Sequence, residues 1–174
     1  EIVRSLLDEI IELAIVSQPF PERGFVSIPF YEEDLTVIVP PDHPWCLEKG
    51  IDAERIFEED FLIREPGSGT RESYIKALQQ RYPHHHLRVA MVLGSTEAIK
   101  RGVIGKMGIS IVSPLACHIE VKQGLLRKID IKGMKIKRRF DIVYRSEENL
   151  SIQTMKWKEY LLKEKSEDFP LAFS

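Results

Sequence analysis

Short apolar runs alternate with amphipathic segments along almost the whole chain, and this alternation limits the fold more than any other feature. Apolar runs bounded by turn residues predict strands buried in a sheet, and apolar residues at helical spacing predict helices. The expected strands include residues 13–16, 61–64, 87–93, 109–112, 126–131 and 140–144. The expected helices include residues 1–10, 71–82, 94–103 and 151–165. Such alternation predicts an α/β protein with largely parallel strand pairing.

Several stretches between these elements are less regular. Two β-rich runs, residues 25–31 and 34–39, are interrupted by acids, and residues 51–59 are typical of a short helix. The basic stretch 132–139 carries five cations between two expected strands, so a solvated loop is the preferred interpretation and nucleic-acid contact the second. The expected buried side of the last helix consists of Met155, Trp157, Leu161 and Leu162.

Length and charge exclude several classes of protein. The 174 residues suffice for one domain or two small interlocked ones. Lys and Arg number 25 against 27 Asp and Glu, a net charge of −2 that does not suit a domain that holds DNA by itself. No apolar run approaches the length of a membrane span, and the first residues lack the pattern of a signal peptide, so we expect a cytoplasmic protein without membrane contact.

The segment from Arg64 to Arg71, Arg-Glu-Pro-Gly-Ser-Gly-Thr-Arg, joins the end of an expected strand to the start of an expected helix. Amides in the first turn of a helix have no partner within the helix, and the helix dipole makes this end favourable for an anion. Ser68, Gly69, Thr70 and Arg71 are therefore candidate anion-binding residues. The alternative is that Ser68 or Gly69 only caps the helix.

Other motifs offer less. Ser95 and Thr96 open a further helix, where capping by Ser95 is preferred and lining of a cleft is the alternative. The two cysteines and the run His84–His86 lack the spacing of a metal site, and neither a phosphate-binding loop, a dinucleotide fingerprint nor a nucleophile motif is present. We therefore expect no catalytic residue, no metal and no cofactor, and a protein that is not an enzyme.

Taken in order, six stretches resemble the effector-sensing domain of LysR-type bacterial transcriptional regulators. They are residues 12–16, 29–44, 61–71, 93–100, 108–113 and 143–145. The 64–71 stretch looks like the branch of regulators of sulfur assimilation and carbon fixation. The resemblance implies a fold like the type II periplasmic-binding proteins, with two Rossmann-like subdomains joined by two crossover strands. Residues 1–28 with 139–174 would form one subdomain, and residues 29–138 the other.

By the same resemblance, a small anionic effector would bind between the subdomains. Ser68, Thr70 and Arg71 would lie on one wall and Ser17 and Gln18 on the other. The protein would form a homodimer or homotetramer, with its first helix at the interface, and would contact DNA only through an N-terminal domain that this chain lacks. The alternative is a solute-binding protein of a transport system, since the two share the fold.

Overall fold

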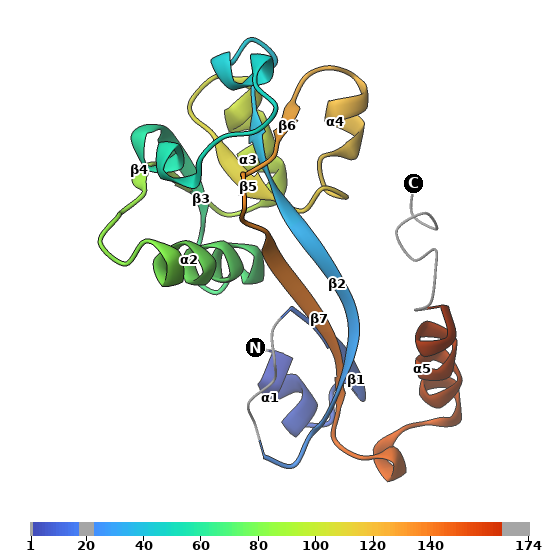
Figure 1. Cartoon of the computed structure of the whole chain (residues 1–174). Helices are drawn as coiled ribbons and strands as arrows, with labels where there is room; N and C mark the ends of the chain where they lie inside the picture. Colours follow the sequence, from blue (N-terminus) through green and yellow to red (C-terminus); the bar gives the residue numbers. More distant parts are fainter. Residues whose placement is uncertain (1, 18–22, 165–174) are drawn as a thin grey trace. The chain divides into compact units, whose positions relative to one another are not determined.

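The structure, a computed structural model, describes residues 2–17 and 23–164 of the chain. Its residues form two compact units. Unit 1 contains the described residues up to 32 and those from 139 onward, and unit 2 contains residues 33–138. Two long strands, β2 (Val26–Val39) and β7 (Ile136–Tyr144), are neighbours in one sheet (Figure 1). Each of these strands contributes residues to both units.

The strands of unit 2 are short and differ in burial. The end of β2 pairs antiparallel with β5 (Ser110–Val112) and with β6 (Arg127–Ile129). A separate two-stranded sheet contains β3 (Asp60–Arg64) and β4 (Arg88–Leu93), which pair in parallel. The carboxyl ends of β3 and β5 are followed by the turns that lead to helices, so polar residues of these turns lie at one edge of the strands.

Helices and single turns connect these strands. Helix α2 (Gly69–Arg81) joins β3 to β4, α3 (Thr96–Ile104) joins β4 to β5, and α4 (His118–Lys122) lies between β5 and β6. Two 3₁₀ turns, Pro44–Leu47 and Ala53–Glu58, precede β3. The second half of β2 and most of β3 are buried between two apolar clusters, one of which includes Val37, Phe61 and Tyr74, and the other Ile38, Leu62 and Ile99. Alternate residues of β2 and β3 thus enter different clusters, as the period of a strand requires.

Unit 1 is built around the pairing of β1 (Leu13–Val16) with β7, which is antiparallel. Helix α1 (Ile2–Leu7) precedes β1, and a 3₁₀ turn (Glu147–Asn149) and helix α5 (Ile152–Glu164) follow β7. Phe30, Ile142 and Leu161 belong to one apolar cluster, and Leu6 and Val143 to a second. These clusters are small, which is consistent with the few strands of this unit.

Most of the expected elements are present, but the expected strand direction is wrong. Among the described strands only β3–β4 has a parallel ladder, whereas β1–β7, β2–β5 and β2–β6 are antiparallel. Burial on both faces gives an apolar run whichever way the neighbouring strand runs, so the sequence pattern did not fix direction. The β1 strand is also only half-buried.

Four further expectations are corrected. Residues 25–31 and 34–39 fall in one continuous strand from Val26 to Val39, because Glu32 and Asp34 lie on its exposed face and the buried Glu33 accepts a hydrogen bond from Ser113. The helix expected at 51–59 is a 3₁₀ turn. The basic stretch 132–139 is a loop only in its first half, since β7 begins at Ile136. On α5, Trp157 is 52% exposed instead of buried, whereas Leu161 is buried as expected.

Candidate functional site

Helix α2 begins without the side-chain cap that the sequence allows. Gly67 has a φ of +88°, which turns the chain after β3, and Ser68 is the N-cap residue in an extended conformation. The Ser68 hydroxyl makes no capping hydrogen bond, although the residue is buried. The amides of the first turn of α2 are therefore not satisfied by Ser68. At α3, in contrast, the Ser95 hydroxyl accepts a hydrogen bond of 3.1 Å from the amide of Ala98, so the preferred capping role of Ser95 is confirmed.

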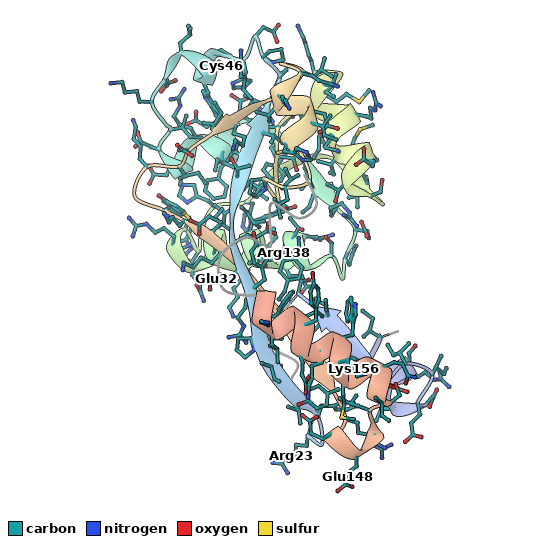
Figure 2. All side chains as sticks on the ribbon, turned by 90° about the vertical axis from the view of Figure 1, so that its right-hand side faces the viewer. Arg23, Glu32, Cys46, Arg138, Glu148 and Lys156 are labelled. Atoms are coloured by element: carbon teal, nitrogen blue, oxygen red, sulfur yellow. The ribbon has the colours of Figure 1, made fainter. Side chains whose placement is uncertain are left out.

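Thr70, the second residue of α2, is held by an arginine from a distant strand. Nη1 of Arg138, on β7, donates a hydrogen bond of 2.9 Å to Oγ1 of Thr70, and both residues belong to unit 2. Figure 2 labels Arg138. The same nitrogen lies 3.5 Å from Oε1 of Glu33, whose side chain is only 3% exposed. Oε2 of Glu33 accepts a hydrogen bond of 2.6 Å from Ser113, the residue after β5.

A second threonine is held in the same way. Nη1 of Arg64, the last residue of β3, donates a hydrogen bond of 2.7 Å to Oγ1 of Thr96, the first residue of α3. The Nε and Nη2 atoms of Arg64 each donate to a different carboxylate oxygen of Glu65, both at 2.7 Å. Such two-point pairing of a guanidinium with a carboxylate fixes both groups. Each threonine thus accepts from an arginine that is itself paired with a glutamate.

Arg71 is turned back toward the preceding strand. Its Nη1 donates a hydrogen bond of 2.8 Å to the backbone carbonyl of Arg64. The side chain also lines a groove of about 590 Å³ beside α2, together with Pro66, Glu72 and Ile75. Arg71 therefore stabilises the turn that precedes the helix, and its positive charge lies close to the first turn of α2.

The environment changes the acidity of several of these groups. The hydrogen bonds from Arg64 lower the pKa of Glu65 to about 2, and they raise the pKa of Arg64. Burial raises the pKa of Glu33 despite the hydrogen bond from Ser113 and the charge of Arg138. Burial likewise lowers the pKa of Arg138. Beneath the site, burial raises the pKa of Tyr74.

The other sequence-predicted site residues lie in different parts of the chain. Gly69 opens α2, and its carbonyl accepts a hydrogen bond of 2.8 Å from Ser73. Ser17 follows β1 in unit 1 and is partly exposed, and Gln18 lies outside the described residues. Thr70 and Thr96 each accept a hydrogen bond from an arginine of unit 2, and the hydrogen bond from Arg71 to the carbonyl of Arg64 joins the start of α2 to the second of these sets, so we call the two sets together the polar cluster. The second wall predicted at Ser17 and Gln18 stays a prediction.

Sequence reasoning missed the residues that organise this cluster: Glu33, Arg64, Ser113 and Arg138. The sequence pattern predicts a solvated loop for Arg138 and, for Glu33, a place among acids that separate two strands. No local pattern marks either residue, because 105 positions separate the pair. Only the pairing of β2 with β5, which brings Ser113 near Glu33, and the path of β7 bring these groups together.

The described residues contain no candidate metal site. Within residues 2–17 and 23–164, no group of three or more His, Cys, Asp or Glu side chains is arranged to hold a metal ion. In the same residues every helix is too short or too polar to span a bilayer. The polar cluster at the start of α2 and α3 is thus the best-organised candidate site of the described chain.

Comparisons with known proteins agree on one family. The family model described as "LysR substrate binding domain" matches residues 1–166. The RuBisCO operon transcriptional regulator of Acidithiobacillus ferrooxidans is 34% identical over 86% of this chain and 48% of its own length. The transcriptional activator CmpR of Synechocystis is 33% identical over 92% of this chain and 52% of its own length. The chain therefore spans about half the length of these relatives.

Solved structures give the same fold. The regulatory domain of CcmR from Synechocystis, in complex with 2-PG, has a TM-score of 0.82 and is 32% identical, covering 95% of this chain and 79% of that one. The effector-binding domain of QuiR, in complex with shikimate, has a TM-score of 0.83 over 97% of this chain and 78% of that one. At 19% identity QuiR shows the fold alone. These neighbours confirm the expected α/β fold of the type II periplasmic-binding-protein kind.

Proposed function

The chain belongs to the LysR substrate-binding domain family, and on this premise we propose that its effector is a small anion that binds at the start of α2. The chain is the effector-binding regulatory domain of a LysR-type regulator. In the proposal, the amides of the first turn of α2 and the hydroxyl of Thr70 bind the anion, and Arg71 adds positive charge. Occupation of this site regulates transcription by the whole protein.

One observation carries the choice of an anion site over a simple cap. Ser68 stands at the N-cap of α2 but makes no capping hydrogen bond, whereas Ser95 caps α3. Thus the start of α2 keeps donors available, and the dipole of a 13-residue helix favours negative charge there. An anion supplies acceptors for these donors.

The CcmR neighbour supports a first compound to test. That domain is in complex with 2-PG, and its identity to this chain is 32%. We propose that 2-PG, or an anion of similar size, is the effector of this chain as well. The relatives named above regulate transcription, which favours a regulator over a solute-binding protein or an enzyme. DNA would then be bound by a part of the protein outside this chain.

Calorimetric titration of the purified protein with 2-PG and with inorganic phosphate tests the site. Thr70→Ala and Arg71→Ala are each expected to weaken 2-PG binding about tenfold, the effect of losing one hydrogen bond or close charge. Arg81→Ala, an exposed arginine in the last turn of α2, is the matched control and is expected to bind like the wild type. Unchanged 2-PG affinity in both site variants would show that the anion binds elsewhere. Absence of binding by the wild type would show that neither probe is a ligand of this site.

We propose a second copy of this chain as a further binding partner. Three apolar residues of β4 are 42–58% exposed, namely Val89, Met91 and Val92. Among the described residues β4 pairs only with β3, so its other edge is open to a further strand or surface. Exposed apolar strand edges of this kind are typical of interfaces. A second copy of this chain is the proposed occupant.

A further inference from the structure

We infer that Arg138 is a positioning residue that orients the Thr70 hydroxyl so that its O–H donates a hydrogen bond to the anion, an inference that rests on the proposed function of the site. A guanidinium has only donors. Because Nη1 of Arg138 lies 2.9 Å from Oγ1 of Thr70, the threonine oxygen accepts in this contact. Its own O–H is then left to donate to another group. An anionic oxygen is the partner that such a donor favours.

Burial makes this orientation effective. Thr70 is 8% exposed and the Arg138 side chain 18% exposed, so few water molecules compete for the contact. A hydroxyl in water exchanges its partners freely, whereas a hydroxyl that accepts a hydrogen bond from a largely buried guanidinium has one lone pair held in place, which restricts the directions in which its O–H can point. The amides of the first turn of α2 point toward the helix start, and Thr70 is the second residue of this turn, so its hydroxyl lies close to other donors.

Glu33 explains why Arg138 acts through Thr70 instead of by its own charge. The Glu33 carboxylate lies 3.5 Å from Nη1 of Arg138 and is held on its other oxygen by Ser113. Where Glu33 is ionised, it offsets the positive charge of Arg138 within unit 2 before any ligand binds. The group that contacts the anion is then an oriented, uncharged hydroxyl. Such a donor favours ligands whose acceptor atom fits the hydroxyl over ligands that carry only a negative charge.

A second, independent instance of the same arrangement supports the inference. Arg64 is paired with Glu65 by two hydrogen bonds and donates a third to Thr96. Thr96 begins α3 as Thr70 begins α2, and the Thr96 hydroxyl is likewise left as a donor at a helix start. In both sets an arginine paired with a glutamate orients a threonine at a helix N-terminus. This shared arrangement favours a role in ligand binding over helix capping.

A double-mutant cycle in the purified protein tests the inference, with the affinity for 2-PG measured by calorimetry. Thr70→Val removes the hydroxyl with little change of shape, and Arg138→Gln removes the guanidinium. Each single variant is expected to bind 2-PG about tenfold more weakly, since each removes the same oriented hydrogen bond. The double variant is expected to bind no more weakly than either single variant. A hundredfold loss in the double variant, the product of two independent effects, overturns the inference.

Two controls separate positioning from general damage. Arg139→Gln changes the neighbouring arginine, which is paired with Asp141 in unit 1, and is expected to leave the 2-PG affinity unchanged. Thr70→Ser keeps the hydroxyl and is expected to bind 2-PG within about twofold of the wild-type affinity. Adding Arg138→Gln to Thr70→Ser is expected to weaken 2-PG binding again. Weak binding by Thr70→Ser equal to that of Thr70→Val would contradict a role for the hydroxyl.

Failure of the effector assignment is distinguishable from failure of the inference. If the wild type binds inorganic phosphate but not 2-PG, the effector assignment is wrong, and the same cycle measured with phosphate tests Arg138. Non-additive losses with phosphate then support the inference, and additive or absent losses overturn it. If the wild type binds neither probe, the anion site and the role of Arg138 are both overturned.

Discussion

Arg138 and Thr70 form a hydrogen bond of 2.9 Å although 68 positions separate them in the chain. The contact joins a long strand that takes part in both units to the first turn of the helix that carries the candidate site. Glu33, on the other such strand, holds the same guanidinium. Both long strands therefore contribute a side chain to the polar cluster of unit 2.

The two serines at helix starts are expected to differ in what they contribute. Ser95→Ala removes a capping hydrogen bond and should lower the free energy of unfolding by about 1 kcal/mol. Ser68→Ala removes no capping bond and should lower it by less than about 0.5 kcal/mol. Urea unfolding of the two variants beside the wild type measures both effects. An equal loss in the two variants would mean that Ser68 does cap α2.

Glu33 gives the protein a pH dependence of stability. Burial raises the folded-state pKa of Glu33 above its usual 4.5, so the folded state favours the protonated form. The contribution of protonated Glu33 to the free energy of unfolding is thus fully present below pH 4.5, and it is lost as the pH rises through the folded-state pKa. Glu33→Gln lacks this titration, so the stability advantage of the wild type over this variant is expected to shrink as the pH rises.

Urea unfolding at pH 4.5 and at about pH 8 measures that difference for Glu33→Gln. An advantage of the wild type that grows with pH would mean that Arg138 lowers the pKa of Glu33 more than burial raises it.

Gly108 is expected to tolerate no side chain. Its φ is +148°, and a Cβ there would lie 2.9 Å from the carbonyl carbon of Asp60 and closer still to the oxygen. That oxygen accepts a hydrogen bond of 2.8 Å from Ile109, so any shift also weakens the contact between β3 and the start of β5. Gly108→Ala should lower the free energy of unfolding by about 3 kcal/mol. Gly94→Ala, where the Cβ would meet no atom within 4 Å, should be nearly neutral, as chemical denaturation will measure.

Local sequence patterns predicted helices and strands better than they predicted contacts between residues far apart in the chain. The strand 61–64, the helix after it and the capping role of Ser95 follow from local patterns, and each is present. Strand direction, the continuity of β2 and the burial of Arg138 depend on which segments become neighbours, and neighbours far apart in the chain leave no local pattern. The arginine–glutamate pairs of the site therefore emerged only from the structure, whereas the anion predicted from the glycines, hydroxyls and arginine of the 64–71 segment stays a prediction.

The exposed residues of β4 lead to a prediction about oligomeric state. If a second copy covers this strand, Val92→Lys places a charge in the contact, and the protein should become monomeric at concentrations where the wild type is a dimer or larger. Val92 is 58% exposed, so the change should cost little stability within one chain. Ile119→Lys, at a 53% exposed residue of α4, is the matched control and should leave the mass unchanged. Size-exclusion chromatography with light scattering measures the mass, and an unaltered mass for Val92→Lys would place the self-contact away from β4.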